Sequence, residues 1–289
     1  MAAGVRELSA DDRRSVRAAV LGSPVGHSLS PVLHLAAYAA LGLTWWRYEA
    51  IECDEAGLPA MLDSCGPDWA GLSLTMPLKR AVLPLLDRVE PLAAEVGGAN
   101  TVLFAAATRI GYNTDVPGMV HALAEHGVRP DAGESGRCVI FGGGATACAA
   151  LAALRELGER SASVAVRDQG RTAELTAAAG RMGMAVEYVP FGPAALSGAR
   201  LVISTVPAGA ANPLAGAFGQ IAVAPGVLFD VVYHPWPTQL ADAAAGVGAV
   251  VVSGFDLLLH QAALQVELLT GRPAPVEQMR AAGLTALER

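Results

Sequence analysis

The sequence has few charged residues, few aromatic residues and no excess of basic ones. Of its 289 residues, 16% are charged, 5% are aromatic and 53% are hydrophobic, and 20 Lys and Arg stand against 27 Asp and Glu, a formal net charge of −7. Nucleic-acid-binding proteins and proteins that bind anionic membranes usually carry a basic surface, so we expect neither a nucleic acid nor a membrane as partner. The apolar content excludes general disorder, and the length predicts two domains.

The chain also lacks the cysteine patterns that hold metals or build disulfide scaffolds. Its 4 cysteines form no CxxC pair and have no metal-type spacing with the 6 histidines. We therefore expect reduced thiols and no metal site.

No segment is typical of a membrane span or a secretory signal. Residues 201–229 carry no charge, but Pro207, Pro213 and Pro225 interrupt them, which predicts a strand, a loop and a second strand. Several charged residues precede the first apolar run, which is not the order of a signal peptide. The sequence thus predicts a cytoplasmic protein, either a monomer or a homodimer.

Short apolar strands alternate with helical patterns along most of the chain. The first part predicts strands at 17–22, 46–51 and 70–75 and two adjacent strands at 101–106 and 108–112. After the Gly- and Pro-containing segment 127–136, strands and helices alternate, which indicates a parallel sheet with helices on both faces. The strands of this second part are predicted at 138–141, 163–166, 185–189, 200–204, 226–232 and 248–252. The fold class is therefore α/β.

A glycine-rich turn follows the strand at 138–141 and opens the next helix. It consists of Gly142, Gly143, Gly144, Ala145, Thr146 and Ala147, a GxGxxA pattern. Gly142 permits the tight turn, Gly144 lets the backbone approach a pyrophosphate, and the start of the helix offers N–H groups to that anion. Such turns also join strands to helices for steric reasons alone. The strands before and after the helix favour nucleotide binding and a Rossmann-type, doubly wound parallel sheet.

The residues after the next strand bear on the choice of cofactor. Arg167 and Arg171 favour the 2′-phosphate of NADP, whereas Asp168 favours the free 2′-hydroxyl of NAD. A later strand on the same edge ends in Ser204, Thr205, Val206 and Pro207, which are either cofactor contacts or an ordinary Pro-terminated strand.

Polar residues also gather at strand ends and helix starts in the first part of the chain. They are Ser28, Ser30, Thr75, Lys79, Asn100 and Asp115. Each one taken singly is more often a capping residue. Together they suit a small polyol acid, with hydroxyls and an amide for its oxygens and one Lys and one Asp for proton transfer.

The chain resembles the shikimate dehydrogenase family through a series of motifs in the same order. These are Ser23-Pro-Val-Gly-His-Ser-Leu-Ser-Pro-Val-Leu-His34, Leu74-Thr-Met-Pro-Leu-Lys79, Gly98-Ala-Asn-Thr101, Gly111-Tyr-Asn-Thr-Asp115, the glycine turn, Ser204-Thr-Val-Pro207, Asp230-Val-Val-Tyr233 and Gly254-Phe-Asp-Leu-Leu-Leu-His-Gln261. The resemblance extends from about residue 18 to the end of the chain.

This resemblance implies two domains and a reaction. An N-terminal α/β substrate-binding domain would comprise residues 1–116 and 254–289, and an NADP-binding Rossmann domain residues 117–253. The implied reaction is the reversible, NADP-dependent reduction of 3-dehydroshikimate to shikimate, on the route to the aromatic amino acids.

The resemblance also implies roles for individual residues. Ser28 and Ser30 would bind the substrate carboxylate, with Tyr233 nearby, and Thr75, Asn100 and Gln261 would bind the ring hydroxyls. Lys79 and Asp115 would be the catalytic pair. Val231, Gly254 and Leu257 would join the glycine turn, the β-strand-end residues Arg167, Asp168 and Arg171, and the segment 204–207 in binding the cofactor.

Three alternatives remain open at this point. Many NADP-using members have Asn-Arg-Thr after the second Rossmann strand, whereas this chain has Arg167-Asp168-Gln169, so NAD is the alternative cofactor. A related enzyme of a specialised pathway would act on quinate or an aminated shikimate. From another class, a ligand-sensing relative without catalysis would lack a reason to keep both Lys79 and Asp115.

Overall fold

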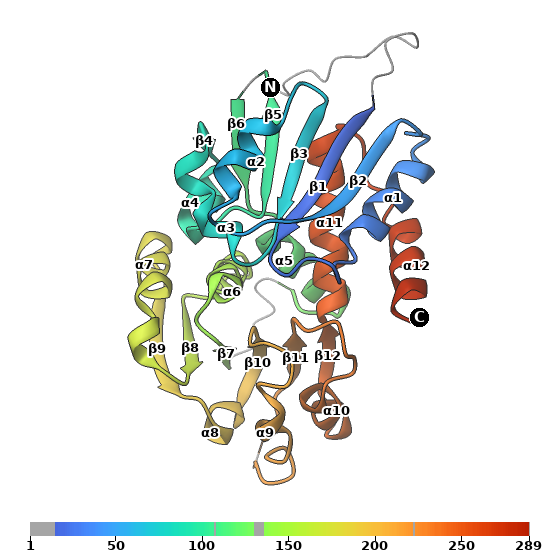
Figure 1. Ribbon diagram of the computed structural model, residues 1–289. Helices are drawn as coiled ribbons and strands as arrows, with labels where there is room; N and C mark the ends of the chain where they lie inside the picture. Colours follow the sequence, from blue (N-terminus) through green and yellow to red (C-terminus); the bar gives the residue numbers. More distant parts are fainter. Residues whose placement is uncertain (1–14, 107, 130–135, 222, 289) are drawn as a thin grey trace. The chain divides into compact units, whose positions relative to one another are not determined.

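The chain folds into two compact units, which a computed structural model describes over residues 15–106, 108–129, 136–221 and 223–288 (Figure 1). The first unit holds the described residues up to Ala94, Gly98–Thr114 and the residues from Gln261 onward. The second holds Glu95–Gly97 and Asp115–His260. The boundary between the units at His260–Gln261 therefore lies inside the long helix α11 (Gly254–Thr270). No helix in these ranges is both long enough and apolar enough to cross a membrane.

The first unit is built on a mixed six-stranded sheet in the order β2-β1-β3-β5-β6-β4. Strand β1 pairs in parallel with β2 and β3, whereas β5 is antiparallel to both β3 and β6. The bounds are β1 Val16–Gly22, β2 Trp46–Glu52, β3 Trp69–Leu74, β4 Arg88–Val89, β5 Thr101–Ala105 and β6 Thr108–Tyr112. The helices that start in this unit are α1 Ser30–Ala40, α2 Leu58–Ser64, α3 Leu78–Ala81, η1 Leu83–Leu85, α4 Pro91–Val96 and α12 Val276–Leu287.

Both faces of this sheet are covered by apolar clusters. Successive residues of a strand point to opposite sides, so one strand contributes to both clusters. In β1, Ala19 and Leu21 belong to one apolar cluster, and Ala18 and Val20 to another. Gly71 in β3 has no room for a side chain, since a Cβ there would collide with the carbonyl oxygen of Val102 on the neighbouring strand. The first unit therefore has two cores, one on each side of the sheet.

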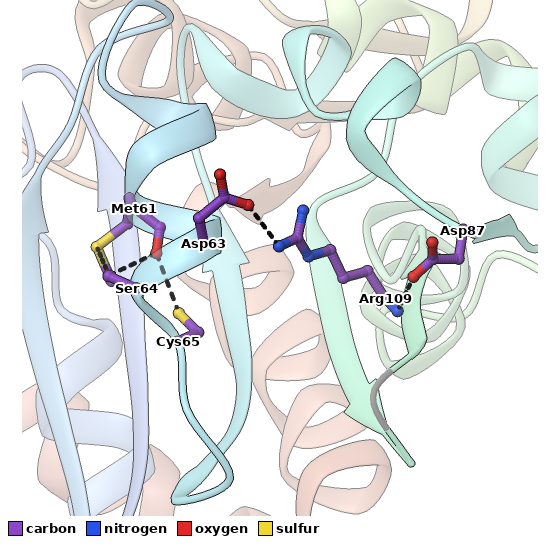
Figure 2. A network of polar contacts seen from close by, with 6 residues as sticks. All are labelled: Met61, Asp63, Ser64, Cys65, Asp87 and Arg109. Atoms are coloured by element: carbon purple, nitrogen blue, oxygen red, sulfur yellow. Dashed lines mark hydrogen bonds and ion pairs between the residues drawn. The ribbon is translucent and has the colours of Figure 1, made fainter.

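One edge of this sheet is held by a polar network around Arg109 of β6 (Figure 2). Its guanidinium lies 2.7 Å from Oδ1 of Asp63 in α2, and its backbone N–H donates to Oδ2 of Asp87, just before β4, at 2.7 Å. In the same view, the carbonyl of Met61 accepts from the hydroxyl of Ser64 and the thiol of Cys65. Burial raises the pKa of Cys65 to about 11, so this thiol keeps its proton at neutral pH.

The second unit is built on an all-parallel sheet in the order β12-β11-β10-β7-β8-β9. Counted from β7 as the first strand, this is the strand order 3-2-1-4-5-6 of a Rossmann fold, which confirms the predicted doubly wound sheet. The strands are β7 Arg137–Phe141, β8 Ser161–Val166, β9 Ala185–Pro190, β10 Ala199–Ser204, β11 Val227–Asp230 and β12 Val250–Ser253. The helices are α5 Asp115–Glu125, α6 Ala145–Glu156, η2 Gln169–Arg171, α7 Ala173–Met182, α8 Pro193–Leu196, α9 Asn212–Ala215 and α10 Gln239–Gly246.

Small side chains let the helices of this second unit pack close to the sheet. In α6, every residue from Ala147 to Leu154 is buried, and six of these eight are alanine or cysteine. The sheet contributes Val139, Phe141 and Leu228, each with no exposed surface. The strand order reverses between β7 and β10, and it is at such a point of an open α/β sheet that ligands bind.

Candidate active site

The glycine turn between β7 and α6 lies at this reversal of strand order. Gly142 has a φ of 110°, and a Cβ there would lie 2.5 Å from Oγ1 of Thr205. Gly142 is thus required by the fold itself. Gly144 is different, because its φ is −85° and a Cβ would have no heavy atom within 4 Å. The space in front of Gly144 is open, as a pyrophosphate site needs.

The start of α6 is not capped by a side chain. Gly144 is its N-cap and makes no side-chain cap hydrogen bond, and Ala145 and Thr146 form the first helical positions. The first N–H groups of a helix lack partners within the helix and attract anions. Together with Gly142 and Gly143, this helix start fits the pyrophosphate of a dinucleotide.

At the end of β8, two exposed charged side chains are held by different groups. Oδ1 of Asp168 accepts from the backbone N–H of Gly170 at 2.8 Å, so this carboxylate caps the short helix η2. The guanidinium of Arg167 donates to the carbonyl of Ala210 at 2.6 Å and lies 4.9 Å from the centre of the Phe191 ring. The side chain of Arg171 lies outside the part of the chain that the structure describes.

The end of β10 is locked to the end of β7. Both the backbone N–H and the hydroxyl of Thr205 donate to the carbonyl of Phe141 at 2.8 Å. Ser204 is fully buried, Val206 is half-buried and Pro207 is exposed. The segment predicted from 204 to 207 therefore lies beside the glycine turn, with Thr205 against Gly142.

The residues that follow β11 contact the start of α11, and this region holds further predicted cofactor residues and the predicted substrate residue Tyr233. The backbone N–H of Gly254 donates to the carbonyl of Val232. A Cβ on Gly254 would collide with the carbonyl oxygen of Val231. Leu257, one turn later, is 8% exposed. Tyr233 is half-buried, and burial raises its pKa above the ordinary value.

In the first unit, the predicted substrate residues lie at the starts of helices and the ends of strands. Ser30 begins α1 and is 5% exposed, and its backbone N–H donates to Oγ of Ser28 at 3.3 Å. Thr75 follows β3 directly, and Lys79 is the second residue of α3. The carbonyl of Lys79 accepts from the N–H of Ala99, which places Asn100 next to α3.

Asn100 is buried and its side chain has a fixed orientation. Its Oδ1 accepts from the N–H of Thr114 at 2.8 Å and from the hydroxyl of Thr101 at 3.0 Å. Its Nδ2 therefore donates, to Oγ1 of Thr114 at 2.9 Å and to Oε1 of Gln261 at 3.3 Å. Two predicted substrate residues, Asn100 and Gln261, are thus in direct contact. Asp115 follows Thr114 in the chain, is 5% exposed and belongs to the second unit.

The sequence analysis missed a set of buried polar residues behind these side chains. Tyr48, Ser73 and Gln265 are at most 4% exposed, and Gln265 donates to Oγ1 of Thr101 at 3.0 Å and to the carbonyl of Asn100 at 3.3 Å. Two signals were present: Ser73 interrupts an apolar strand, and Gln265 lies four residues after Gln261, on the same face of the helix. Among the described residues, no group of His, Cys, Asp and Glu is placed to hold a metal.

A Rossmann unit with an open glycine turn, in one chain with a second unit rich in buried hydroxyls and amides, defines a dinucleotide-dependent dehydrogenase of small polar substrates. Known proteins narrow this class. The family described as "Shikimate dehydrogenase substrate binding domain" matches residues 20–102, and that described as "Shikimate 5'-dehydrogenase C-terminal domain" matches residues 254–282.

Relatives match almost the whole chain. The shikimate dehydrogenase (NADP(+)) of Moorella thermoacetica is 37% identical over 90% of each chain. Among solved structures, the Mycobacterium tuberculosis shikimate dehydrogenase has a TM-score of 0.82 and 42% identity, covering 94% of this chain and 99% of that one. The Thermus thermophilus enzyme in complex with NADP(H) and shikimate has a TM-score of 0.81 and 34% identity, covering 94% of this chain and 100% of that one. The chain belongs to the shikimate dehydrogenase family.

Proposed function

We propose that this chain reduces 3-dehydroshikimate to shikimate, reversibly and with NADP, in the biosynthesis of aromatic amino acids. The observation that carries the proposal is the match over about nine-tenths of the chain to relatives named shikimate dehydrogenase (NADP(+)). The polar residues of the first unit support it, since a cyclic acid with three hydroxyls needs both an anion site and several hydrogen-bonding groups.

The proposal assigns binding of the substrate to the first unit and binding of NADP to the second, with boundaries near 116 and 254. Ser28, Ser30 and Tyr233 bind the carboxylate of the substrate. Thr75, Asn100 and Gln261 bind the ring hydroxyls. The contact between Asn100 and Gln261 supports this grouping, because it fixes two neighbouring amides for one ligand.

Lys79 and Asp115 act on the proton in the proposed reaction. NADPH, when bound, supplies a hydride to the ketone carbon of the substrate. Negative charge then develops on the ketone oxygen, where the ammonium of Lys79 stabilises it and donates the proton that completes the alcohol. Asp115 orients Lys79 and accepts a hydrogen bond from the neighbouring hydroxyl of the substrate. Such acid–base assistance typically contributes about 10²–10⁴-fold in rate.

Residues of the second unit suit NADP. Gly142, Gly143, Gly144, Ala145 and Thr146 hold the pyrophosphate, the segment Ser204–Pro207 lines the site beside them, and Val231, Gly254 and Leu257 contact the nicotinamide half. The charge of Asp168 favours NAD, but its carboxylate accepts a hydrogen bond from the backbone N–H of Gly170 in its own turn. The guanidinium of Arg167 also donates to the carbonyl of Ala210, but it has five N–H donors, and with Arg171 it pairs with the 2′-phosphate.

A panel of steady-state assays tests this function. Shikimate and quinate are each measured with NADP+ and with NAD+, and we expect kcat/KM to be largest for shikimate with NADP+. A preference for quinate or for NAD+ would assign the chain to the related specialised enzymes. The proposal also includes a cytoplasmic location, supported by four free cysteines, and a monomer or homodimer, which sedimentation would distinguish.

A further inference from the structure

Three buried side chains of the first unit form a hydrogen-bonded series that ends on the amide of Asn100. Nε2 of Gln265 in α11 donates to Oγ1 of Thr101 in β5 at 3.0 Å. The hydroxyl of Thr101 donates in turn to Oδ1 of Asn100 at 3.0 Å. All three residues are at most 1% exposed. Each polar group in the series therefore has to find its partners within the protein.

Two backbone groups determine the direction of the bonds in this series. The N–H of Thr114 donates to Oδ1 of Asn100 at 2.8 Å, and a backbone N–H can only donate. Oδ1 is therefore an acceptor, so the hydroxyl of Thr101 gives it its single hydrogen. At the other end, the backbone carbonyl of Asn100 accepts from Nε2 of Gln265 at 3.3 Å. Thr101 thus receives a hydrogen bond from Gln265 and donates one to Asn100.

The amide of Gln265 is also held from its oxygen end. Its Oε1 accepts from the hydroxyl of Ser73 in β3 at 2.8 Å, and Tyr48 in β2 donates to Oγ of Ser73 at 2.7 Å. Nε2 of His34 lies 3.3 Å from the same Oε1. Burial lowers the pKa of His34 to about 3, so the ring is neutral and carries one N–H. Gln265 cannot turn its amide over without losing these bonds.

The bond from Thr101 distinguishes between the two ends of the Asn100 amide. The hydroxyl of Thr114 does not, because it lies 3.2 Å from Oδ1 and 2.9 Å from Nδ2. The backbone N–H of Thr114 alone would fix the oxygen but let the amide rotate about that bond. A second donor, from Thr101, occupies the other lone pair and fixes the amide plane. Nδ2 is then held toward Oε1 of Gln261, at 3.3 Å.

We propose that Thr101 is a positioning residue for Asn100, whose amide it holds so that Nδ2 donates to a ring hydroxyl of the substrate. Thr101 has no exposed surface, so it acts through Asn100 and not on the ligand itself. The inference rests on the proposed function, in which Asn100 binds a ring hydroxyl of shikimate.

Thr101→Val tests this role, because valine keeps the shape of the side chain and has a methyl group in place of the hydroxyl. We expect KM and the dissociation constant for shikimate to rise about three- to tenfold, the effect of one net hydrogen bond. A bond to a ring hydroxyl forms equally in the bound substrate and in the transition state, so kcat should stay within about twofold of wild type. KM for NADP+ should not change.

Two control variants separate positioning from a loss of packing or stability. Thr101→Ser keeps the hydroxyl and removes the methyl group, so its KM for shikimate should stay within about twofold of wild type. Thr270→Val is the matched control for replacing a buried hydroxyl by a methyl group. Thr270 is 6% exposed, and its hydroxyl donates to the carbonyl of Val266 in its own helix at 2.7 Å. This variant should keep the wild-type KM for shikimate.

Two further variants show whether the effect passes through Asn100. In the Asn100→Ala background there is no amide to position, so adding Thr101→Val should not raise KM for shikimate any further. Thr101→Ala removes the same hydroxyl without adding a methyl group and should raise KM as much as Thr101→Val does. It replaces the valine variant if that one does not fold.

The inference is overturned if the folded hydroxyl-free variants of Thr101 keep the wild-type KM for shikimate, or if their kcat falls as much as kcat/KM. It is also overturned if Thr101→Ser or Thr270→Val raises KM equally, or if Thr101→Val still raises KM in the Asn100→Ala background. The wild-type assay is done first. A wild-type chain that does not turn over shikimate overturns the proposed function and this inference together, whereas an active wild type with an unaffected Thr101→Val overturns the inference alone.

Discussion

The two units differ in what their cores are made of. The first unit buries a connected set of side-chain hydroxyls, amides and an imidazole, from Tyr48 through Gln265 to Asn100. The second unit packs alanine-rich helices on apolar strands, and its proposed dinucleotide site is made largely of backbone, at the turn beginning with Gly142. We therefore expect ligand recognition in the first unit to depend on side chains that are present, and ligand recognition in the second unit to depend on the absence of side chains at the glycine turn.

This difference predicts opposite sensitivities. Truncating a side chain should damage the first unit, because a buried polar group that loses its partner costs about 1–3 kcal/mol. Adding a side chain should damage the second unit, because the backbone approaches neighbours closely there. The following substitutions test this contrast, from the largest expected effect to the smallest.

Lys79→Ala should have the largest effect, since it removes the group that we propose as the proton donor. We expect kcat to fall about 10²–10⁴-fold while the dissociation constant for shikimate stays within about tenfold. Arg80→Ala, the next residue of α3, is the matched control for loss of a cation from this short helix. A kcat of Lys79→Ala within threefold of wild type would show that another group handles the proton.

Arg167→Ala sharpens the contrast, because it is a case in which the second unit depends on a side chain. A charge-assisted hydrogen bond to the 2′-phosphate contributes about 1.5–3 kcal/mol, so NADP+ binding should weaken by roughly ten- to a hundredfold. Binding of NAD+, which has no such phosphate, should hardly change. Titration calorimetry with both dinucleotides measures this, and equal losses for the two would remove Arg167 from the 2′-phosphate site.

The buried imidazole of His34 should make the first unit sensitive to acid. Burial lowers its pKa from 6.5 to about 3, so between these values the unfolded chain binds a proton that the folded chain does not. The free energy of unfolding therefore decreases as the pH falls from 6.5 toward 3, because the folded chain keeps His34 neutral. The slope from this one group is at most about 1.4 kcal/mol per pH unit. His34→Gln should show a correspondingly flatter pH dependence of its unfolding free energy. Equal slopes between pH 6 and 4 for both proteins would contradict this.

Gly142→Ala and Gly144→Ala test the opposite sensitivity in the second unit. At Gly142 the φ of 110° and the contact with Thr205 predict a loss of stability of about 1–3 kcal/mol. Gly144→Ala meets no neighbour, so stability should change little while NADP+ binding weakens. Chemical denaturation and NADP+ titration of both variants measure this. The contrast fails if the two variants lose stability equally.

Arg109→Ala should have the smallest effect, although its network is prominent in Figure 2. The side chain of Asp63 is 73% exposed, and ion pairs in such surroundings contribute about 0–1 kcal/mol. The backbone bond from residue 109 to Asp87 survives the substitution. We expect a change in unfolding free energy below about 1 kcal/mol and unchanged kinetics. A larger loss would mean that the edge of the sheet depends on this guanidinium.

Much of this architecture could be predicted from local patterns. The alternating strands and helices and the glycine turn after β7 follow from apolar periodicity and punctuation by glycine, and the α/β class is confirmed. The two-residue strand β4 was missed, since it exists only through its pairing with β6 at Arg88 and Ile110. Helix α9 was missed because its four residues lie in a charge-free stretch rich in proline and glycine.

The polar core of the first unit could not be predicted, because its partners are far apart in the sequence. Ser73 and Gln265 are separated by 192 positions, and neither residue alone indicates the other. The junction at His260–Gln261 also has no local signal, since α11 continues through it. The roles of Lys79, Asp115 and the other site residues stay predictions.

The discontinuous first unit has a consequence for the order in which the chain folds during synthesis. Its β-strands are all made by residue 112, but Gln265, which satisfies Ser73 and Thr101, and helix α12, which contacts α1, are made some 150 residues later. The second unit has all its strands by Ser253. On the ribosome, the nucleotide-binding half is therefore complete first. Ser73 and Thr101 in the amino-terminal half have no Gln265 to bond with until the final helices have been made.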